Sequence, residues 1–595
     1  MKLNYFFRSL MLVALMTLVT NVYATDIPVA DGATDTELAA ALEQAATGDV
    51  ILINGWITMH APVTITKNVT IKAGVENAGF DGQGSTRLFV ISPEAIEGAK
   101  LLFVNLGFIN GSGLADLTNG GAAQISSGVT EFDLCYFDGN KAARGGAFEI
   151  LGDGLSVTFR GCEATNNVAE GNGGESRGGY LFVDGNNQID HENCKISTNQ
   201  SIGGRGGALC LFGSGTRRFF HTIISDNKAG NWGPDPSGIT TDDVKLDKDG
   251  NPTNDGEYEG GVAFITGGAI TFESCALIAN KSWSHSGIIR SWGLPNITFI
   301  NSTLAKNQSM HDRSPIWTGE ATYTFVNSLF VDNLGQNSGN GAGFDGDGNA
   351  SVNLNIFNSV FSRNVAGADG AVDIRAIPNY ATQLVVKNSL IGLIQGDASG
   401  VIPVDNPNIP TKSNIAMYKI ADEAAQLDYA NLESSGVDFK QGLQYSQSFG
   451  MPYYLLIANS TVTKLGDPAL LANYDINTDL FGQTRITAAD GSIVAAPTSV
   501  AADFHDAVVS PKSDIFGVKL IGNVIENGII GIDYGQLRGA AKAELYSVAG
   551  QKLENVFTGN VVSKGYYNLK TFTPGIYLLK VTIEGKSFAQ RLIVK

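Results

Sequence analysis

One asparagine recurs at the same place in a pattern that the chain repeats eight times between residues 132 and 364. In nearly every repeat an apolar or aromatic residue stands eight positions before it, a small residue five before it and an apolar residue three before it. Successive asparagines are 27, 32, 28, 53, 27, 26 and 31 residues apart, and we interpret the interval of 53 as two turns joined by an insertion. The eight are Asn140, Asn167, Asn199, Asn227, Asn280, Asn307, Asn333 and Asn364.

Self-similarity with a period of this size predicts a solenoid, because each unit buries its apolar face only by stacking on its neighbours. The apolar patches have strand length and lack helical periodicity, so we expect a β-solenoid. Equivalent residues would then lie about 4.8 Å apart, and the asparagines would exchange amide hydrogen bonds as a ladder. Because asparagine tolerates left-handed backbone, we expect these residues to form a corner of each coil.

The cysteines follow the same repeat. Five cysteines in an exported chain would suggest disulfides, but four of them stand five residues before a ladder asparagine, where Ser or Thr fills the other repeats. We therefore expect buried free thiols in an interior column of small residues. The four are Cys135, Cys162, Cys194 and Cys275; Cys210 has no evident partner. His191, which takes a Phe position of the repeat, is predicted to be a core residue.

The two ends of the chain differ from its repetitive middle. Residues 1–24 have the basic start, short apolar stretch and small final residues of a signal peptide, so we expect an exported protein. A short helix is predicted over residues 36–45, where it would cap the solenoid. No later segment approaches the ~18 apolar residues that a membrane span needs.

The sign of the net charge differs between the whole chain and its C-terminal segment. The net charge of −18 disfavours binding to nucleic acid, whereas residues 541–595 hold eight basic and three acidic side chains. This asymmetry is typical of separate units. The predicted organisation is a signal peptide at 1–24, a β-solenoid at 25–495, a linker at 496–517 and a small β-domain at 518–595.

The opening strands at 63–82, the Gly-Gly-Ala steps and the Phe-x-x-[Cys/Ser]-x-apolar-x-x-Asn repeat resemble right-handed parallel β-helix proteins of the pectin-lyase-like class. They are especially similar to the repeats of polymorphic outer-membrane proteins. The resemblance covers residues 26–495 and implies an all-β, right-handed parallel β-helix. The class contains polysaccharide lyases, hydrolases and non-catalytic adhesins, so it does not fix an activity.

The C-terminal motifs resemble a second family. The segments 544–551, 574–581 and 591–595 are similar to the C-terminal sorting domain of type IX secretion cargo, although Gly522-Asn523-Val524 stands where that family usually has Pro-Asn-Pro. The resemblance implies a small immunoglobulin-like β-sandwich and contact with the type IX secretion machinery. It also implies export across the outer membrane, removal of this domain, and release or anchoring at the cell surface.

Four of the five tryptophans fall between residues 231 and 320, each after a ladder asparagine, so successive coils would place them on one side of the solenoid. Indole faces stack on apolar sugar faces, while Arg, His and Asp side chains bind hydroxyl groups. This predicts a glycan-binding platform beside the insertion at 230–259; the alternative is that the aromatic residues pack long loops onto the wall. The candidates are Trp232, Trp283, His285, Arg290, Trp292, His311, Asp312, Arg313 and Trp317.

No catalytic residue can be assigned. A glycoside hydrolase needs a pair of carboxylates, and the outward positions two before the ladder asparagines form no acidic row. A lyase would need a base, for which Arg290 or Arg313 are candidates, and usually a calcium-binding carboxylate cluster. Residues 247–251 match a calcium loop only in part, because Pro252 stands where that loop needs glycine. No metal site is predicted, and calcium is the one cofactor considered.

The sequence therefore predicts a secreted or surface-displayed β-helix, associated with the outer membrane, that binds a glycan or another host or cell-surface ligand without catalysis. A polysaccharide lyase or glycoside hydrolase is the main alternative, and a carboxylate cluster beside Arg290 or Arg313 would favour it. A third alternative, a purely structural stalk, predicts buried tryptophans.

Overall fold

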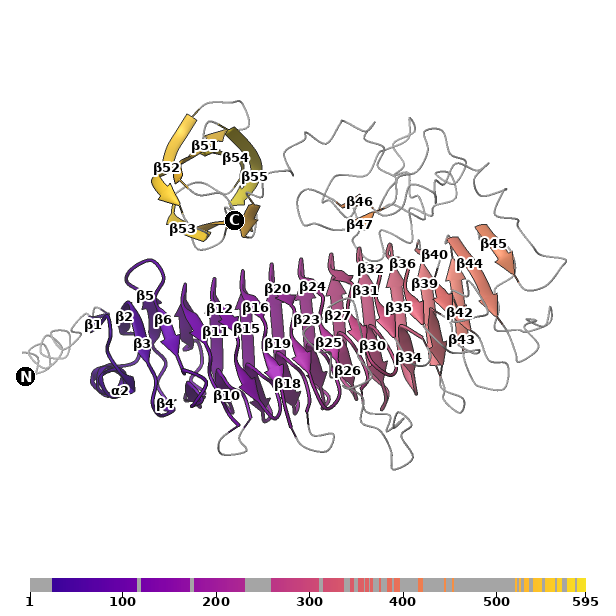
Figure 1. Cartoon of the computed structure of the whole chain (residues 1–595), viewed down its shortest axis with the longest axis horizontal. Coiled ribbons are helices and arrows are strands. Elements are labelled where there is room, and N and C mark those ends of the chain that lie inside the picture. The colour runs from indigo at the N-terminus through magenta and orange to yellow at the C-terminus, as the bar shows by residue number, and fades with distance from the viewer. Residues whose placement is uncertain are drawn as a thin grey trace, which may run out of the picture.

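The structure, a computed structural model, describes residues 24–114, 119–171, 176–230, 258–309, 314–335 and 343–346 and, between 352 and 594, mainly the strands. The predicted signal peptide, except for its last residue, and the predicted linker lie outside the described residues. Within the described part the chain forms a parallel β-helix followed by a small β-domain, as the sequence predicts (Figure 1).

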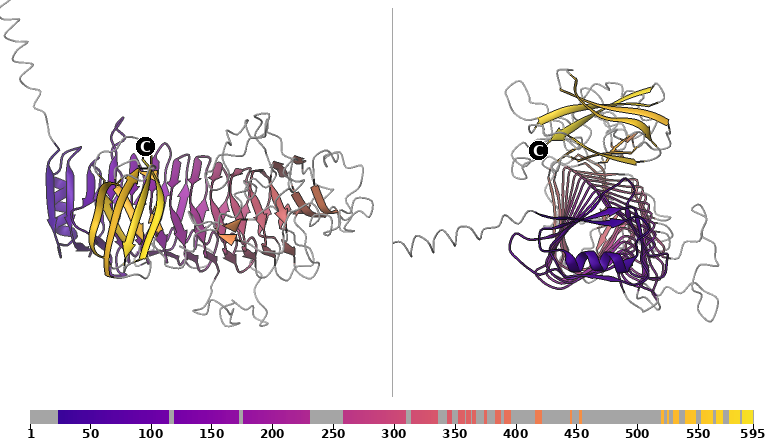
Figure 2. Two further views of the ribbon diagram at one scale, coloured as in Figure 1. Left: turned by 90° about the horizontal axis from the view of Figure 1, so that it is seen from above. Right: turned by 90° about the vertical axis from the view of Figure 1, so that its left-hand side faces the viewer.

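A typical coil of the β-helix contains four strands. One coil consists of β15 (Ser156–Arg160), β16 (Glu163–Thr165), β17 (Val168–Ala169) and β18 (Leu181–Asp184). Each strand pairs in parallel with the equivalent strand of the next coil, as β15 does with β19 (Gln188–Glu192). The coils stack along the long axis, and the view down that axis shows them superimposed (Figure 2).

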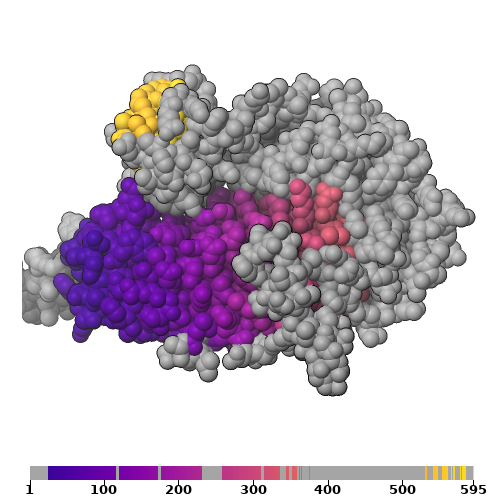
Figure 3. Space-filling view, viewed as in Figure 1, coloured from indigo at the N-terminus to yellow at the C-terminus, as the bar shows by residue number. Residues whose placement is uncertain are grey.

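The four strand positions build four sheets. Sheet 1 has 13 strands and runs from β1 (Asp26–Ala30) to β43 (Gln383–Lys387). Sheet 2 runs from β3 (Trp56–Thr58) to β40 (Val360–Ser362), and sheet 3 from β4 (Val63–Ile65) to β42 (Ile374–Arg375). Sheet 4 has eight two-residue strands, from β13 (Lys141–Ala142) to β41 (Val365–Ala366). Figure 3 shows the surface of the coils from one side, coloured by residue number.

Sheets 2 and 3 meet in the last regular coil. There a single strand, β44 (Leu390–Gln395), pairs with both β40 and β42. In the coils from Asn140 to Asn364 these two strand positions are separated by the asparagine corner and a strand of sheet 4. In β44, Ile394 stands three residues after Ile391, which pairs with Phe361, so Ile394 takes the place of the next asparagine. In this coil both the asparagine and the corner are absent.

The asparagine ladder is confirmed. The side-chain Nδ2 of each asparagine from Asn140 to Asn333 donates to Oδ1 of the asparagine in the next coil, at 2.8–3.0 Å. The same Oδ1 accepts the backbone N–H of the previous asparagine, as Asn167 Oδ1 does from Asn140 at 3.1 Å. Nδ2 also donates to a backbone carbonyl of the preceding coil, three residues before the asparagine there, as from Asn280 to Ile224 O at 2.9 Å. All eight residues are fully buried.

One detail of the predicted corner is wrong. From Asn140 to Asn333 the left-handed residue is the one immediately before the ladder asparagine and not the asparagine itself. Asn166, Thr198 and Ala279 have φ values of 54°, 58° and 56°. The asparagine is thereby left free to point its amide inward along the stack, while the residue outside the ladder makes the bend.

The interior next to sheet 1 is a stack of aromatic rings. Rings from Phe103 to Phe325 follow one another at centroid separations of 4.6–5.1 Å with nearly parallel planes. His191 is one member, between Phe159 and Phe219, and its Nε2 lies 3.2 Å from the hydroxyl of Tyr180. Burial lowers the pKa of His191 to about 3, so its ring is neutral. The prediction of a core histidine is confirmed.

The five cysteines are buried and free, as predicted. Thiols of the small-residue column donate to carbonyls of the aromatic column one coil earlier, as Cys162 Sγ does to Phe132 O at 3.1 Å. Ser302 uses its hydroxyl in the same way toward Phe272 O at 3.0 Å. The column therefore requires a small donor, which explains why Cys, Ser and Thr share it.

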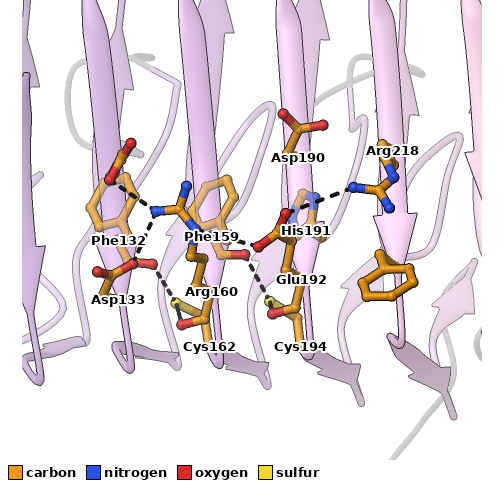
Figure 4. A network of polar contacts seen from close by, with 12 residues as sticks. Phe132, Asp133, Phe159, Arg160, Cys162, Asp190, His191, Glu192, Cys194 and Arg218 are labelled. Atoms are coloured by element: carbon orange, nitrogen blue, oxygen red, sulfur yellow. Dashed lines mark hydrogen bonds and ion pairs between the residues drawn. The ribbon is translucent and has the colours of Figure 1, made fainter. Parts of the chain in front are cut away.

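The outer face of sheet 1 carries a ladder of ion pairs, which we call the charged ladder (Figure 4). Arg160 lies 2.9 Å from Glu131 and 3.4 Å from Glu192. Arg218 in turn lies 3.8 Å from Glu192 and 3.2 Å from Glu273. Positive and negative charges thus alternate along these coils and neutralise one another.

The predicted capping helix is present as α2 (Asp35–Gln44), and it lies across the N-terminal end of the coils (Figure 2). Thr34 is its N-cap and forms a capping box with Glu37. Its buried residues, Leu38, Ala41 and Leu42, belong to the same core as the first coils. No helix in the described part of the chain is long and apolar enough to cross a membrane.

The C-terminal β-domain contains two sheets. One holds β48 (Lys519–Ile521), β50 (Ile529–Asp533) and β53 (Lys564–Asn568). The other holds β49 (Val524–Ile525), β51 (Gly539–Ser547), β52 (Lys552–Val561), β54 (Gly575–Ile583) and β55 (Lys586–Val594). Most pairings are antiparallel, and side chains of both sheets form one core. A small β-domain over the C-terminal residues is therefore confirmed.

Candidate functional site

The predicted platform residues that can be placed lie on or beside the outer face of sheet 3. Strand β30 (Ile289–Ser291) runs between β26 (Ala263–Ile265) and β34 (Ile316–Thr318). Strand alternation buries Ile289 in the core and directs Arg290 outward. In register with Arg290 are Phe264 on one side and Trp317 on the other.

Arg290 is enclosed by two indole rings. Its guanidinium carbon lies 3.4 Å from the ring centroid of Trp317 and 4.4 Å from that of Trp292. Its Nη1 donates to the carbonyl of Trp317 at 3.3 Å. The Arg290 side chain is fully buried, Trp317 is 8% exposed and Trp292 is 48% exposed. The arginine therefore fixes the orientation of an indole that solvent can reach.

Two further side chains complete this cluster. Glu259 Oε1 lies 3.4 Å from Arg290 Nε, and the other Glu259 oxygen lies 3.4 Å from Arg205 Nε. The Glu259 side chain is 5% exposed, so one buried carboxylate is shared by two arginines. His285 packs edge-on against Trp317 with ring centroids 4.8 Å apart. The buried pair between Arg290 and Glu259 stabilises the charged form of the guanidinium.

The cluster is one end of a longer feature on the same wall. In three preceding coils an arginine extends over an aromatic ring of the coil that follows. Arg144 lies 5.6 Å from the Phe182 centroid, Arg177 lies 5.4 Å from Phe212, and Arg205 lies 4.6 Å from Phe264. We call the whole set the arginine–aromatic seam. It consists of Arg144, Arg177, Arg205, Arg290, Phe182, Phe212, Phe264, Trp292 and Trp317.

Glycine pairs allow the seam to form. Each of the first three arginines precedes a glycine of positive φ, and Gly145 has a φ of 56°. A Cβ on Gly145 would lie 1.7 Å from the carbonyl oxygen of Phe148, so only glycine fits. The backbone therefore turns sharply after Arg144, and the same turn follows Arg177 and Arg205.

Cys210 lies among these arginines. It faces outward on β22 (Leu209–Leu211), in register between Phe182 and Phe264. Burial raises the pKa of its thiol to about 12, although the nearby guanidiniums of Arg177, Arg205 and Arg144 act in the opposite direction. The thiol is therefore neutral at physiological pH and behaves as an apolar spacer.

The structure brings together four of the nine predicted site residues: His285, Arg290, Trp292 and Trp317. Trp283 is half-buried, just after β29 (Lys281–Ser282), and its backbone N–H donates to Ala229 O at 2.8 Å. The other four lie outside the described residues, as does the calcium-loop segment at 247–251. These four are Trp232, His311, Asp312 and Arg313.

Sequence reasoning missed Arg144, Arg177, Arg205 and Glu259. The available signal was the residue before each Gly-Gly pair, which is arginine in three consecutive coils and glutamate in the fourth. In the described part of the chain no group of three or more His, Cys, Asp or Glu side chains is placed to hold a metal ion. The chain matches no protein-family model, no curated protein and no solved structure.

Proposed function

We propose that the protein is a secreted or cell-surface β-helix, adhesin-like, that binds a glycan along the arginine–aromatic seam without cleaving it. The observation that supports this most is the half-exposed indole of Trp292, held in place by the buried guanidinium of Arg290. A rigid aromatic face loses little conformational entropy when a sugar ring stacks on it. The stacked coils offer such a ligand a long, straight wall.

Contacts of Arg290 also weigh against the lyase alternative. A general base must give up its proton before it can accept one. Arg290 is fully buried against Glu259 and two indoles, all of which favour the cationic guanidinium. Glu259 itself is engaged by two arginines. This set of contacts suits a support for a binding surface better than a proton-transfer site.

The test is a glycan array with the mature protein, run beside assays for new reducing ends and unsaturated products. Trp292→Ala should lower the affinity for bound glycans by about tenfold or more, because one stacking contact between an indole and a sugar ring is lost. Trp56→Ala is the matched control, since Trp56 lies on the outer face of sheet 2 and packs against Tyr136. Release of unsaturated product, or equal binding by both variants, would contradict the proposal.

For export we propose the type IX route, with the C-terminal β-domain as the sorting signal and the secretion machinery as its partner. The support is that the three motif segments fall mainly on adjacent strands, β51, β54 and β55, so one sheet presents them together. Removal of β55 should leave the protein in the periplasm of a bacterium that has this system. Secretion of the truncated chain at the normal level would contradict the proposal.

A further inference from the structure

Three arginines of the seam stand in one column. Arg144, Arg177 and Arg205 are in parallel bridge register with one another, in consecutive coils. Equivalent positions are one strand spacing apart, about 4.8 Å. All three side chains extend toward the coil that follows, because each guanidinium lies over an aromatic ring there. We call this column the arginine row.

The charges of the row are balanced unevenly within the described residues. Arg144 interacts with the carboxylate of Glu149. Arg205 shares the carboxylate of Glu259 with Arg290. For Arg177, no carboxylate of the described coils lies within ion-pair distance, and its contact is the ring of Phe212. Like charges one strand apart repel each other, in a chain whose net charge is −18. The same chain neutralises the arginines of its charged ladder completely.

The aromatic rings make the row suitable for binding. Each guanidinium rests on a ring face, which restricts its motion. The three arginines are half-buried, so they keep partial access to solvent. Guanidinium groups recognise planar or tetrahedral oxyanions through paired hydrogen bonds. A line of held, evenly spaced guanidiniums therefore matches a polymer that carries an oxyanion on successive units.

We propose that the arginine row binds sulfate or carboxylate groups of an acidic polysaccharide that lies along the solenoid axis. This inference deepens the proposed function, on which it rests, by assigning the ligand a charge and a direction. The sugar chain contacts Trp292 at one end of the seam, and its anionic groups pair with Arg205, Arg177 and Arg144 toward the N-terminal coils. No bond of the ligand is broken, and no metal ion mediates the contact.

The experiment compares three polymers of matched length with the full mature chain: dextran, dextran sulfate and carboxymethyl dextran. We expect at least one anionic polymer to bind more tightly than dextran, and the two anionic arms identify the preferred group. Arg177→Gln should weaken binding of that polymer by about tenfold, the effect of one charged hydrogen-bonded contact. Binding of dextran should not change.

Arg218→Gln is the matched control. Arg218 also rests on a phenylalanine, with its guanidinium 4.7 Å from the Phe220 centroid, but it belongs to the charged ladder on sheet 1. Equal weakening by Arg177→Gln and Arg218→Gln would show a non-specific charge effect and overturn the proposal, as would equal affinity for dextran and both anionic polymers. Circular dichroism and melting temperature confirm that each variant is folded.

Trp292→Ala separates this inference from the proposed function. Weaker binding of all three polymers by Trp292→Ala, with no effect of Arg177→Gln, would keep the glycan platform and reject the arginine row. Loss of anionic binding in Arg177→Gln, with no effect of Trp292→Ala on any polymer, would keep an anion-binding row and reject the platform. Both variants should be impaired if both proposals hold.

Discussion

The asparagine ladder and the arginine row are built in the same way, from one residue type at one position of successive coils. The ladder nevertheless satisfies hydrogen bonds within its own column, whereas the row does not. An asparagine side chain is both donor and acceptor, so each one satisfies the next, at 2.8–3.0 Å. A guanidinium only donates. Stacked arginines therefore repel one another, and they interact with aromatic rings and with the carboxylates of Glu149 and Glu259.

The difference shows how to interpret repeated columns in a solenoid. A self-complementary column completes its own hydrogen bonds, which makes it a structural element and explains its complete burial. A column of like charges leaves interactions to be made by something else. The charged ladder is an intermediate case, because its alternating signs, with Arg160 between Glu131 and Glu192, make it self-sufficient. Among these three columns, the arginine row has the chemistry of a surface that is completed by a ligand.

Among the variants considered, one that interrupts the asparagine ladder should have the largest effect on stability. We expect Asn280→Leu to lower the free energy of unfolding by about 3 kcal/mol or more, because hydrogen bonds to Asn227, Asn307 and Ile224 O are lost inside the core. Urea denaturation followed by fluorescence measures the change. Asn353→Ala, at an exposed position on sheet 1, is the control and should have little effect. Equal denaturation midpoints for the two variants would contradict a self-complementary ladder.

His191, the titratable member of the aromatic stack, should have a smaller effect on stability, and that effect should depend on pH. The pKa of His191 is lowered by burial from 6.5 to about 3. Between these values the unfolded chain binds more protons, so stability is present above pH 6.5 and is lost as the pH falls. The loss is about 1.4 kcal/mol per pH unit, or about 2 kcal/mol at pH 5. Comparison of unfolding at pH 7 and pH 5 should show a shallower dependence in His191→Phe; identical slopes would contradict the assignment.

The smallest effect on stability is expected in the arginine row. Arg177→Gln should change the free energy of unfolding by less than about 0.5 kcal/mol, and toward stabilisation at low salt, because one of three like charges is removed. Thermal melts at low and high ionic strength measure this difference. A loss of unfolding free energy comparable to that of Asn280→Leu would mean that the row is a structural element like the ladder. The contrast between the two columns would then be wrong.

Much of the fold could be predicted because its interactions repeat at a period visible in the sequence. The asparagines, the cysteine column and the capping helix each depend on residue spacing alone. The seam depends on contacts between coils at intervals that vary, such as Arg144 with Phe182 and Arg205 with Phe264. Burial of Arg290 likewise follows from the register that places Trp317 beside it. The bend before the asparagines was missed because residue spacing does not show which of two neighbouring residues adopts a positive φ.

Strand β44 shows what happens when the amide is missing. Where Ile394 replaces asparagine, one strand pairs with both sheet 2 and sheet 3. In the coils that carry the ladder, sheets 2 and 3 are separate sides of the solenoid, and after Asn364 one strand joins them. Duplicating a unit that carries its own Asn should therefore add a coil with separate strands in sheets 2 and 3, whereas a duplicate of the final unit should add a single strand like β44.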